Sequence, residues 1–217
     1  MELDRIVRLG PLPEEQWDDR TRAALAALLP PERRNPRGAG NALATLARHP
    51  DLAEAFLPFN TRLLLRSTLP PRLRELAILR VARRSGCAYE WAHHVRIAAK
   101  AGLSEAEIEA AGNGKAIGPG EASERNETNG DGVTDGVVGG ELDGTTLSGV
   151  GGGELDRAVL DAVDELAEGC NLSDRTWSTL AAHLDERQLM DLVFTVGAYV
   201  LLAMAFNTFG VEPEHER

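Results

Sequence analysis

The chain has 217 residues, of which 43% are hydrophobic and only 5% aromatic, and this is enough to bury the core of one domain. Its net charge of −11 argues against a nucleic-acid-binding protein, because such proteins neutralise phosphates with basic side chains. Its two cysteines, Cys87 and Cys170, stand far apart without a Cys-x-x-Cys spacing. This excludes a disulfide framework or a zinc site of the usual kind and fits a reducing compartment.

The N-terminal residues MELDRIVRLGPLPEEQW carry charges throughout and lack the apolar segment of a signal peptide. The longest apolar run, LVFTVGAYVLLAMAF from Leu192 to Phe206, is shorter than the roughly 18 residues that a bilayer crossing needs. We therefore expect a cytoplasmic protein without a membrane partner, in which this run forms a buried core helix.

Helical spacing or helix-forming residues occupy the chain on both sides of one glycine-rich segment, and no run of alternating β-branched residues competes with them. The sequence therefore predicts an all-α fold, a multi-helix bundle, in a single domain over residues 1–217. The predicted helices are Pro13 to Leu29, Gly40 to Leu46, Pro50 to Ser67, Pro71 to Arg84, Cys87 to Ala101, Ser104 to Ala111, Glu154 to Glu168, Ser173 to Leu184 and Glu186 to Phe209.

The segment from about residue 112 to 153 differs in composition from the rest of the chain. It carries seven acidic and two basic residues, and so supplies five of the eleven net negative charges. Because it is nearly free of large apolar side chains, it cannot bury enough surface to offset the entropy of ordering. We expect a flexible, acidic, Gly-rich insertion. It is loosely similar to a calcium loop but lacks the EF-hand spacing.

Two junctions between predicted helices carry structural signals. The pair Pro70-Pro71 stops one helix and starts the next, because a proline is tolerated at a first helical position. Farther along, Gly102 reads as a C-cap, and Ser104 with Glu107 reads as a capping box. These signals fix helix boundaries and carry no functional weight.

The stretch CAYEWAHH, from Cys87 to His94, places a thiol, a carboxylate and an imidazole in one short segment. On a helical wheel Cys87, Glu90 and His94 fall within a narrow arc on the apolar face, whereas Tyr89 and His93 fall elsewhere. Burying a carboxylate and an imidazole is costly unless each finds a partner. The three residues are therefore predicted to line a pocket or to belong to a buried polar network.

The preceding predicted helix, PRLRELAILRVARR, offers a partner for this network. Its Glu75 shares an apolar face with Ile78 and is thus a second carboxylate on a buried stripe. The break at Ser85-Gly86 lets the two helices fold against each other, which would bring Glu75 toward His94. A Glu75–His94 pair that only ties two helices together is the alternative interpretation.

These residues resemble the carboxymuconolactone decarboxylase-like proteins, which are related in fold to the alkylhydroperoxidase D-like helical proteins. The resemblance is carried by LPPRLRELAILRVARRSGCAYEWAHHVRIAAKAGLSEAEIEA, from Leu69 to Ala110. It extends to the chain from Leu155 to Glu214 and to the upstream segment ARHPDLAEAFLPF. The resemblance implies a helical bundle, no cofactor, a small-molecule substrate, and assembly into a dimer, trimer or hexamer.

Members of this family carry a glutamate on one helix, then Cys-x-x-Cys or a variant of it, then a histidine four residues later. Matched position by position, Glu75 and His94 take the places of the glutamate and the histidine, and Cys87 that of the first cysteine. Glu90 stands where the second cysteine would be. The peroxide-reducing members cycle two cysteines between dithiol and disulfide, which Glu90 cannot do. Peroxidase activity of Cys87 with an external thiol is therefore the alternative function.

The decarboxylating members remove carbon dioxide from a carboxylated lactone, and this requires stabilising a dienolate-like intermediate and delivering a proton. By resemblance, we expect His94 to be the general acid/base and Glu75 its orienting partner. Burial should raise the pKa of Glu90, which could share a proton with His94 or bind substrate. Cys87 is expected to be a neutral wall or relay.

Several other functions are left open by the sequence. The same pocket suits isomerisation or ring closure of a metabolite, and a non-catalytic oligomeric interaction protein is a further alternative. Arg62, Arg66 and Arg80 are candidates for meeting an anionic substrate, but solvated surface positions are the favoured interpretation for each. Glu90 and His93 have the Glu-x-x-His spacing of di-iron bundles, but no second copy exists, so we expect no metal.

Overall fold

The computed structural model describes residues 6–113 and 152–214, and every regular element in these ranges is helical, as predicted. The expected insertion at about residues 112–153 lies almost entirely outside the described residues. The helices are α1 (Asp19–Ala24), α2 (Pro36–Leu46), α3 (Pro50–Leu65), α4 (Pro71–Arg84), α5 (Ala88–Lys100), α6 (Glu105–Asn113), α7 (Gly152–Gly169), α8 (Asp174–Ala181) and α9 (Glu186–Phe209), with short 3-10 helices η1 (Glu14–Gln16) and η2 (Pro31–Arg33).

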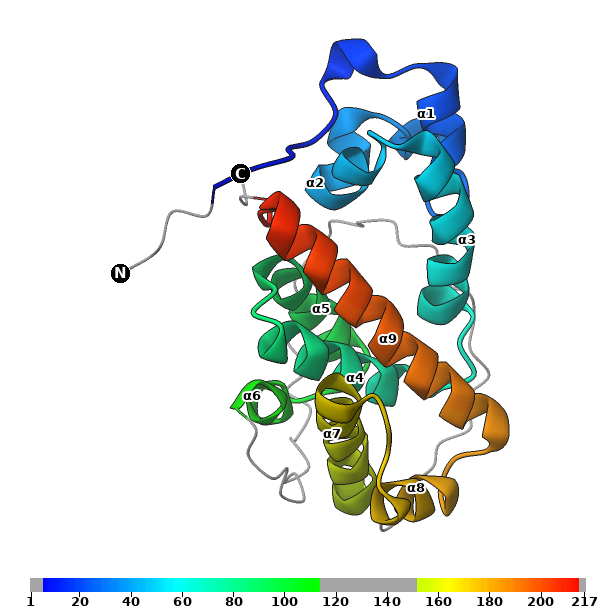
Figure 1. Ribbon diagram of the computed structural model, residues 1–217, viewed down its shortest axis with the longest axis vertical. Helices are drawn as coiled ribbons and strands as arrows, with labels where there is room; N and C mark the ends of the chain where they lie inside the picture. Colours follow the sequence, from blue (N-terminus) through cyan, green and yellow to red (C-terminus); the bar gives the residue numbers. More distant parts are fainter. Residues whose placement is uncertain (1–5, 114–151, 215–217) are drawn as a thin grey trace, which may run out of the picture.

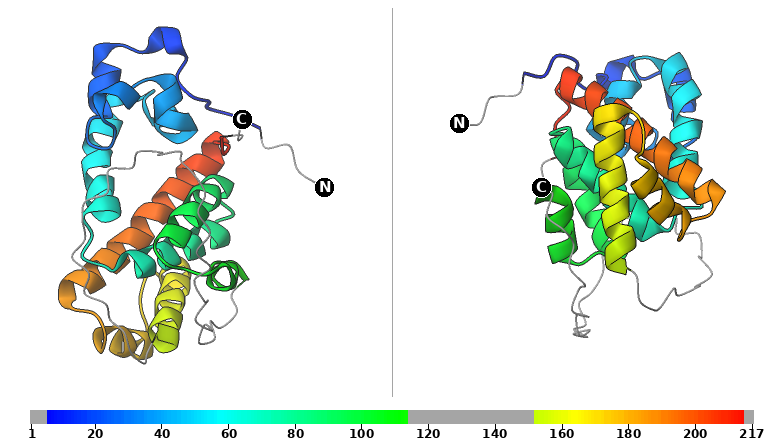
Figure 2. Two further views of the ribbon diagram at one scale, coloured as in Figure 1. Left: turned by 180° about the vertical axis from the view of Figure 1, so that it is seen from behind. Right: turned by 60° about the horizontal axis from the view of Figure 1, so that its bottom comes forward.

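The long helix α9 crosses the molecule diagonally, with α4 and α5 on one side and α3 on the other (Figures 1 and 2). Helix α4 is central, because it packs against α5, α6, α7 and α9. Its residues 76–79 have no exposed surface. The N-terminal helices α1 to α3 bury a second apolar cluster, and Phe56 on α3 contacts both clusters. The two apolar clusters therefore adjoin at Phe56, where α3 packs against α9.

The turn between α4 and α5 sets the position of the CAYEWAHH segment. Gly86 adopts the left-handed conformation (φ +59°), and the Cys87 N–H donates to the carbonyl of Ala82 over 2.8 Å. This is a helix-ending turn that favours glycine, because a side chain at positive φ is strained. It folds α5 back along α4. The capping box predicted farther along is also present, since Ser104 and Glu107 exchange side-chain-to-backbone hydrogen bonds.

The arginine-rich side of α4 pairs with the acidic side of α7. Arg80 is 9% exposed and donates two hydrogen bonds to the Asp164 carboxylate, at 2.7 and 2.5 Å. One turn farther along α4, Arg84 donates to Glu168 over 2.6 Å. One face of α4 therefore binds α7 through charges, which leaves the opposite face, with Glu75, for α5 and α9.

Two predicted helices differ from the structure by more than three residues at one end or both. Residues 13–29, predicted as one helix, contain η1 and then the six-residue α1, which begins after Asp18 caps the N–H of Thr21. The Trp17 indole N–H donates to the Leu12 carbonyl over 3.0 Å and holds the chain in a turn before that cap. Helix α2 begins at Pro36, earlier than predicted, and continues through a kink at Gly40 (φ +68°). In both cases local caps and turns override helix propensity.

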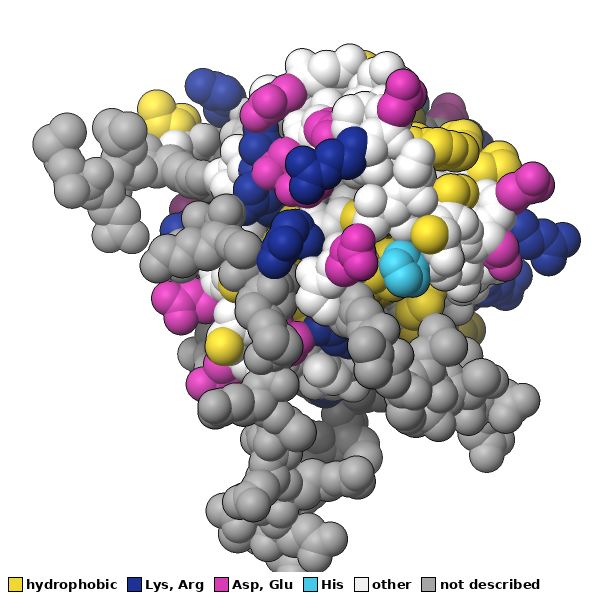
Figure 3. All heavy atoms as spheres, turned by 90° about the horizontal axis from the view of Figure 1, so that it is seen from below, with side chains coloured by type: hydrophobic (Ala, Val, Ile, Leu, Met, Phe, Trp, Pro, Cys, Tyr) yellow, Lys and Arg dark blue, Asp and Glu magenta, His cyan; other side chains and the backbone are white. Residues whose placement is uncertain are grey.

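Helix α9 is long and apolar enough, by length and composition, to cross a membrane, although half of its most apolar window is buried in the protein. Exposed residues of the helix carry large apolar side chains on one stripe. Seen from the α8 end, hydrophobic side chains gather toward the side on which α9 begins (Figure 3). The exposed apolar residues of α9 are Met190, Val193, Phe194, Leu201 and Met204.

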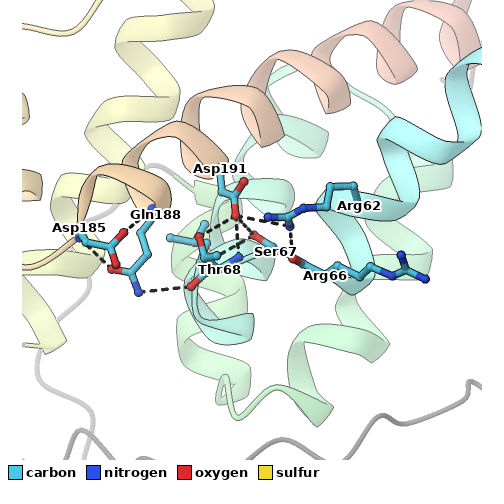
Figure 4. Close-up of polar contacts among 8 residues, drawn as sticks. Arg62, Arg66, Ser67, Thr68, Asp185, Gln188 and Asp191 are labelled. Atoms are coloured by element: carbon cyan, nitrogen blue, oxygen red, sulfur yellow. Dashed lines mark hydrogen bonds and ion pairs between the residues drawn. The ribbon is translucent and has the colours of Figure 1, made fainter.

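Asp191 on α9 holds the junction between α3 and α4 (Figure 4). One of its carboxylate oxygens accepts the Thr68 N–H at 2.6 Å, the Thr68 hydroxyl at 2.8 Å and the Ser67 hydroxyl at 3.1 Å. Arg62 lies 3.8 Å from the same oxygen. Partial burial works against ionisation, but the donors from Thr68 and Ser67 outweigh it and lower the pKa of Asp191. The carboxylate thus caps the turn that leads into α4.

Replacing Asp191 with Ala is expected to lower the free energy of unfolding by about 1–3 kcal/mol, because the half-buried Thr68 N–H loses its acceptor. Urea denaturation measures this effect. Glu54→Ala, an exposed acid on α3, is the control and should change stability by less than about 0.5 kcal/mol. Equal midpoints for the two variants would mean that the cap contributes nothing.

Candidate functional site

The buried centre of the candidate site is a chain of three side chains that links α4 to α5. The His94 ring nitrogen Nδ1 lies 2.7 Å from Glu75 Oε2, and the Arg74 Nε–H donates to Glu75 Oε1 over 3.0 Å. The Glu75 side chain has no exposed surface, and those of His94 and Arg74 are 9% and 12% exposed. The predicted meeting of Glu75 and His94 is therefore present, and Arg74 adds a cation that the sequence did not indicate.

The Glu75 carboxylate orients the imidazole of His94. A carboxylate acceptor favours the tautomer with hydrogen on Nδ1 and leaves Nε2 free to exchange protons. Arg74 balances the charge of Glu75, because an isolated carboxylate could not stay ionised in the core. The contact at Nδ1 thus fixes the orientation of the His94 ring, as is usual for a histidine that acts as an acid or base.

Glu90 is a second buried carboxyl on the same side of α5 as His94. Glu90 is 2% exposed, and neither of its carboxyl oxygens meets an N–H or O–H donor among the described residues. Burial raises the pKa of Glu90 to about 8, and the Cys87 thiol opposes this only in part. At neutral pH Glu90 is therefore mostly a neutral carboxylic acid that can donate a hydrogen bond or a proton.

A cavity of about 420 Å³ opens beside these residues, between the N-terminal helices and α5 with α9. Glu90 and His94 line it, together with Tyr199 from α9 and Asn60 from α3. The remaining wall is mostly aliphatic and aromatic. This volume and lining suit a small, largely apolar molecule with one or two polar groups. The apolar side chains of the wall include Leu28, Leu29, Leu43, Leu46, Phe56, Leu57, Leu64, Ile97, Leu202 and Phe206.

Cys87 lies apart from the cavity, although it was predicted to belong to the site. It is 2% exposed, occupies the N-cap position of α5 and does not line the cavity. Cys170 is exposed at the end of α7 and forms no disulfide with Cys87. Among the predicted site residues, the structure thus brings Glu90 and His94 to the cavity, with Glu75 directly behind His94. The roles assigned to all four remain predictions.

The arginines proposed from the sequence to meet an anionic substrate are not at the cavity. Arg62 lies near Asp191, Arg66 is outside the cavity lining, and Arg80 is paired with Asp164. The sequence could not place these arginines, because helical periodicity assigns a residue to a face but does not say which neighbour the face meets. The cations that do line the cavity are Arg33, Arg37 and Arg96.

One end of the cavity is lined by groups that cluster around Glu214. His93 Nε2 lies 2.7 Å from Glu214 Oε2, and the Asn41 N–H donates to Oε1 over 2.6 Å. Partial burial works against ionisation, but these hydrogen bonds lower the pKa of Glu214 to about 2. Tyr89 packs against His93 with the rings tilted, 4.3 Å between centroids, and completes the cluster. Tyr89 and His93, expected to face away, thus also line the cavity.

Sequence reasoning missed Tyr199 and Asn60. Each is a single polar residue within an apolar stretch, AYVLLAMAF and FLPFN, and both are buried, at 3% and 7% exposure. A lone polar group on the buried stripe of a helix was the signal that could have found them. Among the residues that the structure describes, no group of three or more His, Cys, Asp or Glu side chains is placed to hold a metal ion.

The pKa of Glu90 predicts how stability depends on pH. Unfolded, this group titrates near its usual 4.5, and folded near 8, so between these values the folded protein holds more protons. The free energy of unfolding should therefore fall as pH rises from about 5 to 8, by up to about 1.4 kcal/mol per pH unit, and level off above. Glu90→Gln should remove this slope. Urea unfolding of both proteins from pH 5 to 9 measures it; parallel curves would show that Glu90 is already ionised.

Comparison with known proteins fits this description. Residues 50–126 match the carboxymuconolactone decarboxylase family, a range that contains Glu75, Cys87, Glu90 and His94. No curated protein matches the chain. A solved structure of a protein of unknown function from Agrobacterium tumefaciens, whose description suggests an AhpD-type antioxidant defence protein, is 22% identical. It covers 78% of this chain and 94% of its own, with a TM-score of 0.54, and so shares the fold.

The residues of the candidate site, the match over residues 50–126 and the shared helical fold agree with one another. Residues 50–126 of the chain therefore match the carboxymuconolactone decarboxylase family, and the chain shares the all-α fold of the AhpD-type structure.

Proposed function

We propose that the protein is a cofactor-free decarboxylase, or a closely related proton-transfer enzyme, that acts on a small carboxylated lactone or similar metabolite. The observation that carries the proposal is the contact between Glu75 and His94 at 2.7 Å, buried behind a mostly apolar cavity that Glu90 also lines. A histidine oriented by a carboxylate is suited to moving a proton. A neutral carboxylic acid beside it supplies a second proton donor.

In this reaction the substrate carboxylate loses carbon dioxide, and the electron pair of the broken carbon–carbon bond moves into the conjugated carbonyl. The resulting enolate then takes up one proton at carbon, so the overall reaction consumes one proton and releases carbon dioxide. His94, recharged from solvent, delivers that proton. Glu90 lines the same cavity and can hydrogen-bond the enolate oxygen. No oxidant or reductant is involved.

The proposal is tested by giving the purified protein a carboxymuconolactone-type substrate and, in parallel, a hydroperoxide with a dithiol reductant. Carbon dioxide release without peroxide consumption is the expected result. Peroxide consumption that is lost in Cys87→Ser would instead support the thiol-dependent alternative. Inactivity in both assays, with the folded protein verified by circular dichroism, would contradict both activities and favour the interaction protein.

We also propose that the protein self-associates through α9 and the adjoining face of α3. Phe194 and Met204 are 51% and 62% exposed, and Phe59 packs edge-to-face on Phe194 at 6.1 Å between ring centroids while staying 42% exposed. Exposed apolar stripes of this kind mark interaction surfaces. A second copy of the chain covers such a stripe, in a dimer, trimer or hexamer.

Light scattering after gel filtration measures this assembly. Phe194→Glu and Met204→Glu are expected to lower the measured mass toward that of one chain, because each places a charge in an apolar contact. Trp177→Glu on α8, where the indole is 48% exposed, is the matched control and should keep the assembly. A wild-type mass of one chain, or equal masses for all variants, would refute the interface.

A further inference from the structure

Tyr199 is a cavity-lining residue whose hydroxyl the proposed decarboxylation does not use. Tyr199 lies on α9 among aliphatic residues, and its ring packs edge-on against His94, 5.0 Å between centroids at 85°. No described residue hydrogen-bonds its hydroxyl, although the residue is only 3% exposed and lines the cavity. A buried phenol usually finds a partner. Here the partner that the geometry leaves room for is a ligand in the cavity.

Tyr199 and Glu90 approach the same region from two helices. Both line the cavity beside His94, and Glu90 is close enough to act electrostatically on the Tyr199 hydroxyl. Neither of the two buried oxygens of Glu90 meets an N–H or O–H donor among the described residues. Burial, with Glu75 and Glu90 nearby, raises the pKa of Tyr199 well above its ordinary value. At neutral pH the cavity therefore presents two neutral O–H donors next to a histidine.

We propose that Tyr199 and Glu90 form a donor pair that binds the oxygen of a ketone or phenol in this cavity, and that His94 uses it to catalyse enolisation of apolar cyclic ketones. The inference rests on His94 as the proton-transfer group of the proposed function, but it adds an activity that needs no substrate carboxylate. A phenol beside a neutral carboxylic acid in an apolar site is an effective arrangement for stabilising an enolate oxygen.

The proposed step is balanced within the site. His94 Nε2 takes a proton from the carbon next to the carbonyl, the C–H electron pair forms a carbon–carbon double bond, and the carbonyl π pair moves to oxygen. That oxygen accepts hydrogen bonds from Tyr199 and Glu90. Return of the proton to the same carbon exchanges it with solvent, and return to a conjugated carbon shifts a double bond. No proton is gained or lost overall, and no co-reactant is needed.

The ligand class follows from the wall of the cavity. Aliphatic and aromatic side chains such as Phe56, Leu57 and Leu202 surround the polar groups, so the part of the ligand away from its oxygen should be apolar. A cavity of about 420 Å³ accommodates a molecule of two fused six-membered rings. We therefore use 2-naphthol as a mimic of the enolate, naphthalene as its counterpart without oxygen, and 2-tetralone as the ketone.

Binding of 2-naphthol and naphthalene is measured by fluorescence titration. Wild type is expected to bind 2-naphthol at least about tenfold more tightly than naphthalene, because the donor pair holds only the oxygen. Tyr199→Phe and Glu90→Leu should each reduce this preference several-fold while leaving naphthalene affinity unchanged, which also verifies that the cavity is intact. Tyr89→Phe, at a hydroxyl already engaged by Glu214, is the matched control and should keep the preference.

Catalysis is measured as exchange of the acidic C–H protons of 2-tetralone in D₂O by nuclear magnetic resonance. The wild-type protein should accelerate exchange, His94→Gln should lose about a hundredfold of that acceleration, and Tyr199→Phe about tenfold. Equal affinity for 2-naphthol and naphthalene, or a preference that survives in Tyr199→Phe and Glu90→Leu, would overturn the donor pair. Binding preference without exchange would overturn the enolisation activity. The binding preference and the proton exchange are both measured without carbon dioxide release. They therefore still test the donor pair and the enolisation if the decarboxylation assay fails.

Discussion

Replacing His94 with Gln is expected to lower kcat/KM of the protein on its substrate by about 10²–10⁴-fold, because the group that transfers the proton is lost. The substitution should not unfold the protein, since a glutamine amide N–H can still donate to the buried Glu75 carboxylate that His94 contacts at 2.7 Å. Steady-state kinetics on a carboxymuconolactone-type substrate, with circular dichroism to verify the fold, measures the effect.

Cys87→Ser is the matched comparison for this prediction, because Cys87 is as buried as Glu90 but lies outside the cavity lining. A residue that does not touch the ligand should alter kcat/KM by no more than about one order of magnitude. If instead Cys87→Ser abolished turnover and His94→Gln were tolerated, the reaction would be thiol chemistry, and the assignment of His94 would be wrong.

Replacing Glu75 with Ala is expected to lower the free energy of unfolding by about 3–5 kcal/mol, as breaking a buried charge pair does. Glu75 has no exposed side-chain surface, and its two oxygens serve Arg74 and His94 separately. Truncation therefore leaves a buried guanidinium and an imidazole without their acceptor. Urea denaturation measures the loss, and kcat/KM should fall as well, because His94 loses its orientation.

A double-mutant cycle separates the buried pair from a general loss of packing. Arg74→Met combined with Glu75→Leu should cost less than the sum of the single variants, because the double variant leaves no unpaired charge of its own. Arg20→Ala removes an ion pair to Asp51 in which both side chains are more than 60% exposed, and it should cost less than about 1 kcal/mol. Additive costs in the buried cycle would mean that Arg74 and Glu75 act independently.

The helices that carry the site were predictable because their signals are local. The apolar periodicity of α4 and α5, the proline at the start of α4 and the break at Gly86 lie within one continuous stretch of the sequence. A helical hairpin with a short turn brings facing residues together, so the contact of Glu75 with His94 could also be expected. Where caps and turns competed with helix propensity, at residues 13–29 and at Gly40, the prediction was wrong.

The rest of the site joins residues that are far apart in the chain. Tyr199 meets His94 across more than one hundred residues, Asn60 comes from α3, and Glu214 comes from beyond the end of α9. Periodicity shows that Tyr199 faces inward but not which helix it faces. The same limit explains the arginines, since Arg80 meets Asp164 only because α7 packs on that side of α4.

The sequence by itself thus determined the all-α fold class, most helix boundaries and the resemblance to the family. It also determined that Glu75, Glu90 and His94 lie on the inward faces of their helices. These depend on backbone hydrogen bonds and side-chain spacing within about ten to twenty residues. Only the tertiary structure decided that Cys87 stays outside the cavity, that Tyr199 enters it and that Arg74 balances Glu75. Those outcomes depend on how helices from distant parts of the chain pack side by side, and the periodicity of one helix does not specify its neighbour.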